Sequence, residues 1–194
     1  MPTDDGSGLS TERLILRRWL DRDRAPFARM NADPEVMRYM TRALSAAETD
    51  AFVERIEAQF RECGFGLWAV ERRADERFLG FTGLAAGVVG APPGTIEIGW
   101  RFDRFAWGQG YATEAARAAL HFGFEEAGLP EIVSMTSTLN LASMRVMERI
   151  GLQRDPAGDF DRPRLPEGHP LRRHVLYRLS RTEYRNAADP TRAL

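Results

Sequence analysis

The sequence of 194 residues lacks lysine altogether, so all 27 of its basic side chains are arginines. Three kinds of site that depend on lysine are therefore excluded: the phosphate-binding lysine of a P-loop, the Schiff-base lysine of a pyridoxal phosphate enzyme and the Ser-x-x-Lys nucleophile pair. If this chain binds phosphate, a site built from backbone N–H groups is the simplest expectation.

Cysteine, histidine and long apolar runs are scarce as well. Cys63 is the single cysteine, so an intrachain disulfide is impossible. Together with His121, His169 and His174 it makes a poor ligand set for a structural zinc ion, and we expect no metal site. No run reaches the ~18 apolar residues of a membrane span, and no signal-peptide pattern opens the chain. These absences predict a cytoplasmic protein without a membrane partner.

The charge balance gives no sign of a nucleic-acid partner. The 27 basic and 28 acidic side chains leave a formal net charge of -1 at pH 7, whereas nucleic-acid binding needs a basic surface. The length predicts one domain, which we place at residues 9–180, with flexible tails at residues 1–8 and 186–194. A monomer and a homodimer both fit these features.

The order of apolar and turn-forming segments predicts the fold class. We expect strand, helix, helix, three strands, helix, strand, helix and strand. Ser45 and Glu48 form the capping box of the second helix, which Gly64 ends. The early hairpins followed by strand-helix-strand units predict a mixed α/β (α+β) fold with helices on both faces of the sheet. Residues 153–170 are expected to form a long loop.

The predicted strand at residues 95–102 has two different faces. Ile96, Ile98, Trp100 and Phe102 alternate onto one face and suit packing against a helix. The opposite face carries Glu97, Gly99 and Arg101. A carboxylate on that face is either a solvated strand residue, a partner of Arg101, or a group that faces a cleft.

A glycine-rich segment follows this strand and carries the most specific signal in the chain. It reads WGQGYATE over residues 107–114 and runs into a predicted helix. Glycines let the backbone approach a phosphate closely, and the first N–H groups of a helix have no intrahelical partner. A tight strand-to-helix turn without a ligand is the alternative. A dinucleotide-binding fingerprint fits poorly, because Thr113 replaces its third glycine and the loop lies past the middle of the chain.

Several segments taken in order resemble the GNAT superfamily of acyl-CoA-dependent N-acetyltransferases. They are WGQGYATEA at residues 107–115, the preceding EIGW, and the N-x-x-S-x-x-V-M-E-R-I-G-L pattern that begins at Asn140. TERLILRRW, NADPEVMRYM and HVLYRL resemble more narrowly the RimJ/RimL-like branch, the ribosomal-protein N-terminal acetyltransferases. The resemblance implies a GNAT-like fold with a mostly antiparallel twisted sheet of about six to seven strands.

The resemblance also implies how acetyl-CoA is bound as a cosubstrate. In the family, the loop amides hold the pyrophosphate, and the pantetheine arm pairs with the preceding strand like an extra strand. Transferred to this sequence, the cofactor-binding residues are Trp100, Arg101, Phe102, Gly108, Gln109, Gly110, Tyr111, Ala112, Thr113 and Asn140.

Acetyl transfer to an amine needs a base, and Glu97 is the candidate. It would act directly or through water, although a bulge in its strand would turn it away. Some N-terminal acetylases of the superfamily carry a strand glutamate where this chain has Met135, which leaves Glu97 more isolated as a candidate.

The resemblance implies a second catalytic residue near Asn140. The superfamily usually has a tyrosine seven residues after this asparagine to protonate the leaving thiolate, but that position here is Met147. The RimL-like branch uses a serine three residues after the asparagine, which is Ser143. A hydroxyl at that place is either a donor to the thiolate or a group bonded to its own helix backbone.

The function expected from these features is an acetyl-CoA-dependent N-acetyltransferase. It would move an acetyl group to a primary amine, for example a protein N-terminus, by direct attack in a ternary complex. We expect the acceptor pocket to draw on residues 34–65 and on Phe65 and Trp68. The missing tyrosine at Met147 leaves a non-catalytic acyl-CoA-binding module on the same fold as the alternative.

Overall fold

One mixed sheet organises the residues that the computed structural model describes, which are 8–87, 94–163 and 165–188. Its nine strands run in the spatial order β1-β2-β3-β4-β5-β6-β9-β7, with β8 pairing alongside β9. The strands are β1 (Leu9–Ser10), β2 (Leu14–Arg17), β3 (Leu67–Arg72), β4 (Arg77–Ala86), β5 (Ile96–Phe102), β6 (Glu131–Ser137), β7 (Gln153–Arg154), β8 (Phe160–Asp161) and β9 (Arg173–Ser180).

The mostly antiparallel sheet expected from the sequence is confirmed. Every strand pair in the described sheet is antiparallel except β5–β6, which is parallel. The strand number is higher than expected because β1, β7 and β8 are two-residue strands. Two of these, β7 and β8, lie within the segment that we expected to be a long loop.

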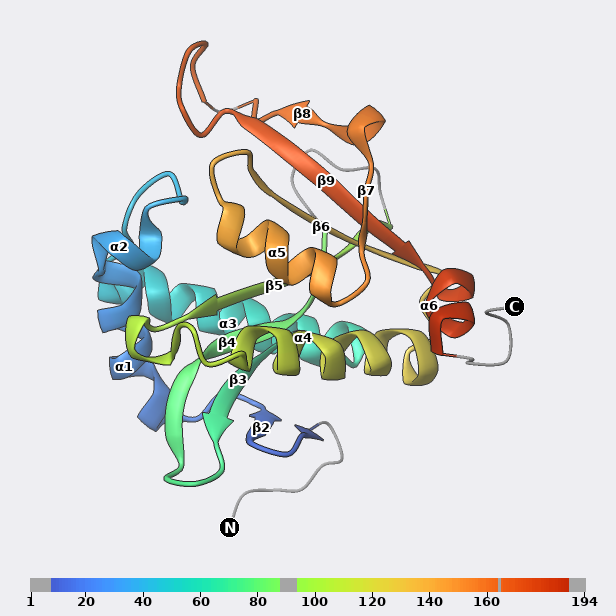
Figure 1. Ribbon diagram of the computed structural model, residues 1–194. Coiled ribbons are helices and arrows are strands. Elements are labelled where there is room, and N and C mark those ends of the chain that lie inside the picture. Colours follow the sequence, from blue (N-terminus) through green and yellow to red (C-terminus); the bar gives the residue numbers. More distant parts are fainter. Residues whose placement is uncertain (1–7, 88–93, 164, 189–194) are drawn as a thin grey trace.

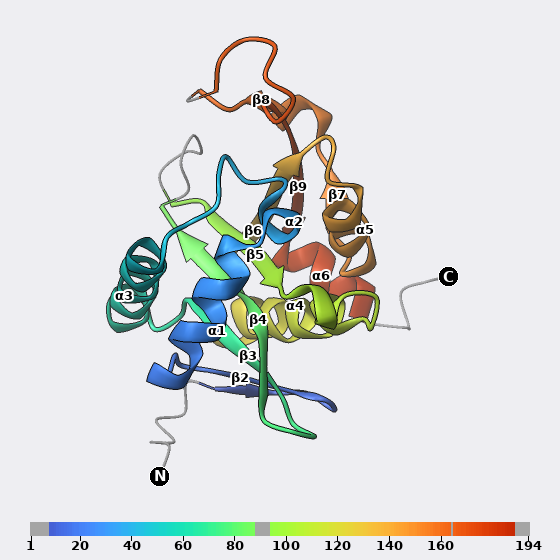
Figure 2. The ribbon, with the colours of Figure 1, turned by 90° about the vertical axis from the view of Figure 1, so that its left-hand side faces the viewer.

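Helices cover both faces of the sheet (Figure 1). Helices α1 and α3 pack on one face, while α4 and α5 lie on the other, as Figure 2 shows from the side. The helices are α1 (Asp21–Ala32), α2 (Pro34–Met37), α3 (Ala46–Cys63), α4 (Tyr111–His121), α5 (Leu141–Arg149) and α6 (Arg181–Ala188), with short turns of other helix types at η1 (Arg104–Ala106), η2 (Phe122–Glu126) and η3 (Pro156–Gly158).

The two expected tails fall mostly outside the described residues. Residues 1–7 and 189–194 are not described, whereas residues 186–188 form the end of α6. Helix α6 was not expected from the sequence. None of the described helices combines the length and low charge that crossing a bilayer requires.

Local sequence signals set the ends of α3. The Ser45 hydroxyl accepts from the Glu48 N–H at 3.2 Å, and the Glu48 carboxylate accepts from the Ser45 N–H at 2.9 Å. This confirms the predicted capping box. At the other end Gly64 adopts a left-handed φ of 76°, which ends the helix without steric cost.

Small side chains let α4 lie close to the centre of the sheet. Ala115, Ala116 and Ala119 are fully buried beside β4 and β5. The other face is filled by larger rings, in which Phe27 lies within 6.2 Å of Trp19, Phe78 and Phe81 by ring centroids. Truncating a ring buried in this way costs about 3–5 kcal/mol.

The strands β5 and β6 meet at a single register pair, Glu97 with Val133. Next to it, the Ser134 hydroxyl donates to the Ile98 carbonyl at 2.9 Å. Beyond this point, residues 99–102 of β5 pair with β4 on one side only. In the described sheet, the end of β5 therefore presents an edge on which no strand lies.

Candidate active site

The unpaired end of β5 lines a cavity of about 400 Å³. Segments distant in sequence form its wall, namely the end of β5, the glycine-rich loop, the start of α5 and the region of α2. The predicted site residues on this wall are Trp100, Arg101, Phe102, Gly108, Gly110, Tyr111, Ala112, Thr113, Asn140 and Ser143. Of the predicted set, Gln109 and Glu97 do not line the cavity.

The glycine-rich loop presents free backbone N–H groups at the start of α4. Gly108 and Gly110 have φ values of 75° and 81°, a backbone region in which other residues are strained. The first bond of the helix runs from the Glu114 N–H to the Gly110 carbonyl at 3.0 Å. The N–H groups of residues 111–113 therefore lack intrahelical acceptors, and the helix dipole adds positive potential there. This arrangement suits a diphosphate.

Arg13 of the N-terminal segment braces this loop. Its Nη1 donates to the Gln109 carbonyl at 3.0 Å, and its Nε donates to the Glu114 carboxylate at 2.7 Å. The guanidinium also lies 4.6 Å from the ring centre of Tyr111. The Thr11 hydroxyl donates to the same Glu114 carboxylate at 2.5 Å. This brace could not be predicted from the sequence, because no local pattern links residues about a hundred positions apart.

Glu97 lies at the one point where β5 and β6 pair. Its side chain is partly buried, and this desolvation raises the pKa of Glu97 to about 7, against smaller opposing effects from the Met135 N–H and Arg162. The β4–β5 register runs without a shift from Gly80–Phe102 to Ala86–Ile96, so the bulge that would turn Glu97 away is absent from this ladder. A carboxyl that titrates near neutral pH suits a general base.

Asn140 and Ser143 open α5 beside the cavity. The Asn140 Oδ1 accepts from the Ser143 N–H at 3.2 Å, and its Nδ2 donates to the Thr136 hydroxyl at 3.0 Å. Asn140 is thus both a helix cap and a lining residue. The Ser143 hydroxyl has no hydrogen-bond partner within the described chain and does not bond back to its own helix. Met147 is buried in the core and supplies no donor.

Two residues expected in the acceptor pocket lie elsewhere. Phe65 and Trp68 are buried in the core, where the Trp68 ring packs against Phe60 and Phe122. The residues of β3 show no alternation between apolar and polar side chains that would indicate which of them face a pocket, because this strand is buried on both faces. Within the expected segment 34–65, the region of α2 does line the cavity, through Glu35, Val36, Arg38, Tyr39 and Met40. In the described ranges, no three His, Cys, Asp or Glu side chains are grouped to hold a metal ion.

Comparison with known proteins identifies the family. The family model "Acetyltransferase (GNAT) domain" matches residues 13–153. An uncharacterized protein of Bacillus subtilis, YkkB, is 36% identical over 145 residues, 74% of this chain and 84% of its own length. An FsC-acetyl coenzyme A-N(2)-transacetylase of Aspergillus fumigatus is 30% identical over 177 residues, 84% of this chain and 72% of its own. This chain belongs to the GNAT acetyltransferase family.

A solved structure agrees with this assignment. The GNAT-family acetyltransferase of Bacillus anthracis superposes with a TM-score of 0.75 at 27% identity, covering 91% of this chain and 99% of its own. The protein is therefore an N-acetyltransferase that uses acetyl-CoA. This assignment favours an enzyme over the alternative, a module that binds acyl-CoA without catalysing a reaction. The loop N–H groups suit the diphosphate of that cosubstrate.

Proposed function

We propose that this N-acetyltransferase transfers the acetyl group to a primary amine by direct attack in a ternary complex. The observation that carries the proposal is the single β5–β6 pair at Glu97. Because β5 and β6 pair only there, residues 99–102 of β5 keep an unpaired edge. This edge lines the same cavity as the glycine-rich loop and Ser143. A cosubstrate bound along this edge would bring its reacting end toward Glu97.

Different residues of the chain act on the amine, on the leaving sulfur and on the diphosphate. The bound acetyl thioester supplies the activated carbonyl carbon. Glu97 takes the proton that the attacking amine loses as the C–N bond forms, either directly or through water. Ser143 donates a hydrogen bond to the sulfur as the C–S bond breaks. Asn140 fixes the Ser143 backbone, and the residues 108–113 hold the diphosphate.

The position of Cys63 supports direct attack. It is exposed at the end of α3 and does not line the cavity. An acyl-enzyme at this thiol would therefore form away from the loop and from Ser143. We assign the reaction to one step within a ternary complex.

The segments at residues 11–19, 31–40 and 174–179 support placement in the RimJ/RimL-like branch. On this basis the acceptor is either a protein N-terminus or a small amine. We place the whole catalytic domain within residues 9–180 and assign it to the cytoplasm, as a monomer or homodimer.

Initial-rate kinetics test the proposal. Acetyl-CoA and each member of a primary-amine panel are varied together, and CoA release is measured. We expect intersecting double-reciprocal lines and full activity in Cys63→Ser. Parallel lines, or loss of acetyl transfer in Cys63→Ser with CoA binding intact, would contradict direct attack.

A further inference from the structure

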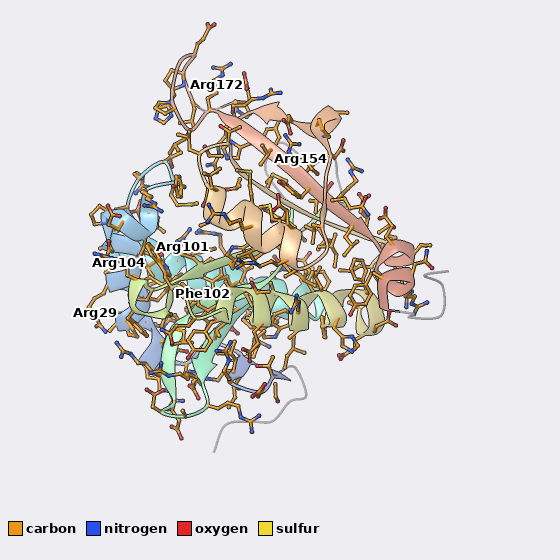
Figure 3. The ribbon with its side chains drawn as sticks, viewed as in Figure 1. Arg29, Arg101, Phe102, Arg104, Arg154 and Arg172 are labelled. Atoms are coloured by element: carbon orange, nitrogen blue, oxygen red, sulfur yellow. The ribbon has the colours of Figure 1, made fainter. Side chains whose placement is uncertain are left out.

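Arg101 places a guanidinium in the cavity without an acidic partner. Figure 3 shows it at the end of β5 between α2 and α5, and it lines the cavity together with residues of both. Its contacts in the described chain are a hydrogen bond from Nη1 to the Asn31 Oδ1 at 2.6 Å and the Phe81 ring at 5.4 Å. No carboxylate of the described residues forms an ion pair with it.

Asn31 holds this guanidinium without neutralising it. Asn31 is fully buried, and its Nδ2 donates to the buried Thr49 hydroxyl at 3.2 Å. This fixes the amide, so its oxygen faces Arg101 and orients it. A guanidinium has five N–H donors, and this bond uses one of them. Burial without a counter-charge lowers the pKa of Arg101 to about 10.

The other arginines on or near the cavity wall are ion-paired or exposed. Arg145 and Arg149 line the cavity from α5 but are exposed to solvent. Arg38, also on the cavity wall, lies 3.6 Å from the Glu35 carboxylate. Arg104, on the following turn, lies 3.8 Å from the Asp33 carboxylate and is more than half exposed. An unpaired, partly buried cation is costly, and an anion brought by a ligand would remove that cost.

Glu97 and Arg101 stand on the same face of β5 with Gly99 between them. They form no ion pair, because four residues of strand separate their Cα atoms by about 13 Å. A Cβ added to Gly99 would meet no atom within 4 Å, so the space above the strand between the two side chains is open. A molecule lying along β5 at this point would run from the guanidinium, on the cavity wall, toward the Glu97 carboxylate, which lies beyond that wall.

We propose that Arg101 binds a carboxylate of the acceptor, so that the acceptor is an amine that carries a carboxylate several bonds away from the reacting nitrogen. This inference rests on the proposed function, because Glu97 marks the reacting end. Planar guanidinium groups bind carboxylates through two parallel hydrogen bonds, and the donors not used by Asn31 are available for this. Arg101 therefore determines acceptor specificity.

The test compares acceptors that differ only in this charge. Acetyl transfer is measured with β-alanine, 4-aminobutyrate, 6-aminohexanoate, α-amino acids and dipeptides, each against its own primary amide. We expect 6-aminohexanoate and the dipeptides, whose carboxylate lies several bonds from the amine, to have a higher kcat/KM than their amides. Arg101→Gln should lower it for them by about 10- to 100-fold, the loss typical of a charged hydrogen bond. The α-amino acids, whose carboxyl carbon is two bonds from the nitrogen, should show no such preference. The same substitution should leave the amides, the KM of acetyl-CoA and the affinity for CoA within about threefold, because the contact expected between residue 101 and the cosubstrate uses the strand backbone, which glutamine keeps.

Arg104→Gln is the matched control, since it removes an exposed arginine three residues further along that does not line the cavity. It should leave the carboxylate preference unchanged. Amides of 6-aminohexanoate and the dipeptides that equal their carboxylates would overturn the inference while leaving the proposed function intact. So would an Arg101→Gln variant that keeps the preference and loses CoA affinity, because the guanidinium would then serve a phosphate of the cosubstrate. Absence of transfer to every amine, with CoA bound, would overturn the proposed function itself.

Discussion

Arg13 and Gln109 are joined by a 3.0 Å hydrogen bond from the arginine Nη1 to the glutamine carbonyl oxygen. The bond connects the N-terminal segment to the middle of the glycine-rich loop. The same guanidinium binds the Glu114 carboxylate on the first turn of α4. The loop is therefore held open toward the cavity from outside, with its N–H groups left for a ligand.

Arg13→Gln should weaken acetyl-CoA binding more than it weakens the fold. The Arg13 side chain is 44% exposed, and an ion pair at such a site contributes less than about 1 kcal/mol to stability. Loss of loop positioning should raise the KM of acetyl-CoA by about 3- to 10-fold with little change in kcat. Arg24→Gln, which breaks an ion-pair network on α1 and α3, is the control. An unchanged KM in Arg13→Gln would show that the Arg13 contacts do not position the loop for acetyl-CoA.

Gly110→Asp should abolish CoA binding, with a loss of at least about 100-fold in affinity measured by calorimetry. The added carboxylate would repel the diphosphate, and an aspartate is also strained at a φ of 81°. Gly64→Asp separates these two effects. Gly64 has a φ of 76° at the end of α3, so the variant carries a similar backbone cost away from the cavity. If both variants lose affinity equally, general destabilisation explains the result and the loop assignment fails.

Glu97 should give the pH–rate profile a limb near pH 7. Burial raises the pKa of this carboxyl to about 7, so the base is increasingly protonated below that pH and kcat/KM should fall as the pH is lowered. In Glu97→Gln the rate should drop about 10²-fold or more, and the limb should disappear. A variant that keeps the limb would assign it to another group.

The thermal stability of Glu97→Gln gives an independent test of the raised pKa of Glu97. Because the pKa of Glu97 is raised in the folded state, ionisation of this carboxyl disfavours folding. The penalty is absent below the unfolded pKa and grows as the pH rises toward about 7. Glu97→Gln should therefore have a higher Tm than the parent protein at pH 8 and a similar one at pH 4. A lower Tm at pH 8 would show that the carboxylate is stabilised by its surroundings.

Ser143→Ala should lower kcat by about 10-fold or more while CoA affinity is kept, since the hydroxyl acts on charge that develops during the reaction. The cap remains, because it uses the Ser143 N–H and the Asn140 side chain. Ser143→Thr retains a hydroxyl and should keep most of the rate. Equal kcat in Ser143→Ala and the parent protein would exclude the serine from the mechanism.

Much of the site was predictable because it is local in sequence. The glycines, the helix start and the Asn140 cap depend on neighbouring residues, and each lies where the sequence placed it. The alternation of β5 likewise separates Glu97 and Arg101 from the Ile98 face. Such features follow from backbone geometry and need no knowledge of the tertiary structure.

The parts that sequence analysis missed depend on contacts between distant segments. Arg17 lies between the buried carboxylates of Asp23 and Glu71, 54 positions away in the second case. The Arg13 brace and the Asn31–Arg101 bond have the same character. The short strands β7 and β8 form only because β9 offers them an edge, so a segment rich in proline and charge gave no local strand signal.

The central claim is that main-chain N–H groups of residues 108–113 bind the diphosphate of the cosubstrate. Titration of ¹⁵N-labelled protein with CoA, followed through its backbone amide resonances, tests this most directly. We expect the largest shifts at Gly108, Gly110, Ala112 and Thr113, and these shifts should be much smaller with pantetheine, which has no diphosphate. Saturable CoA binding that leaves these four amides unperturbed would contradict the account.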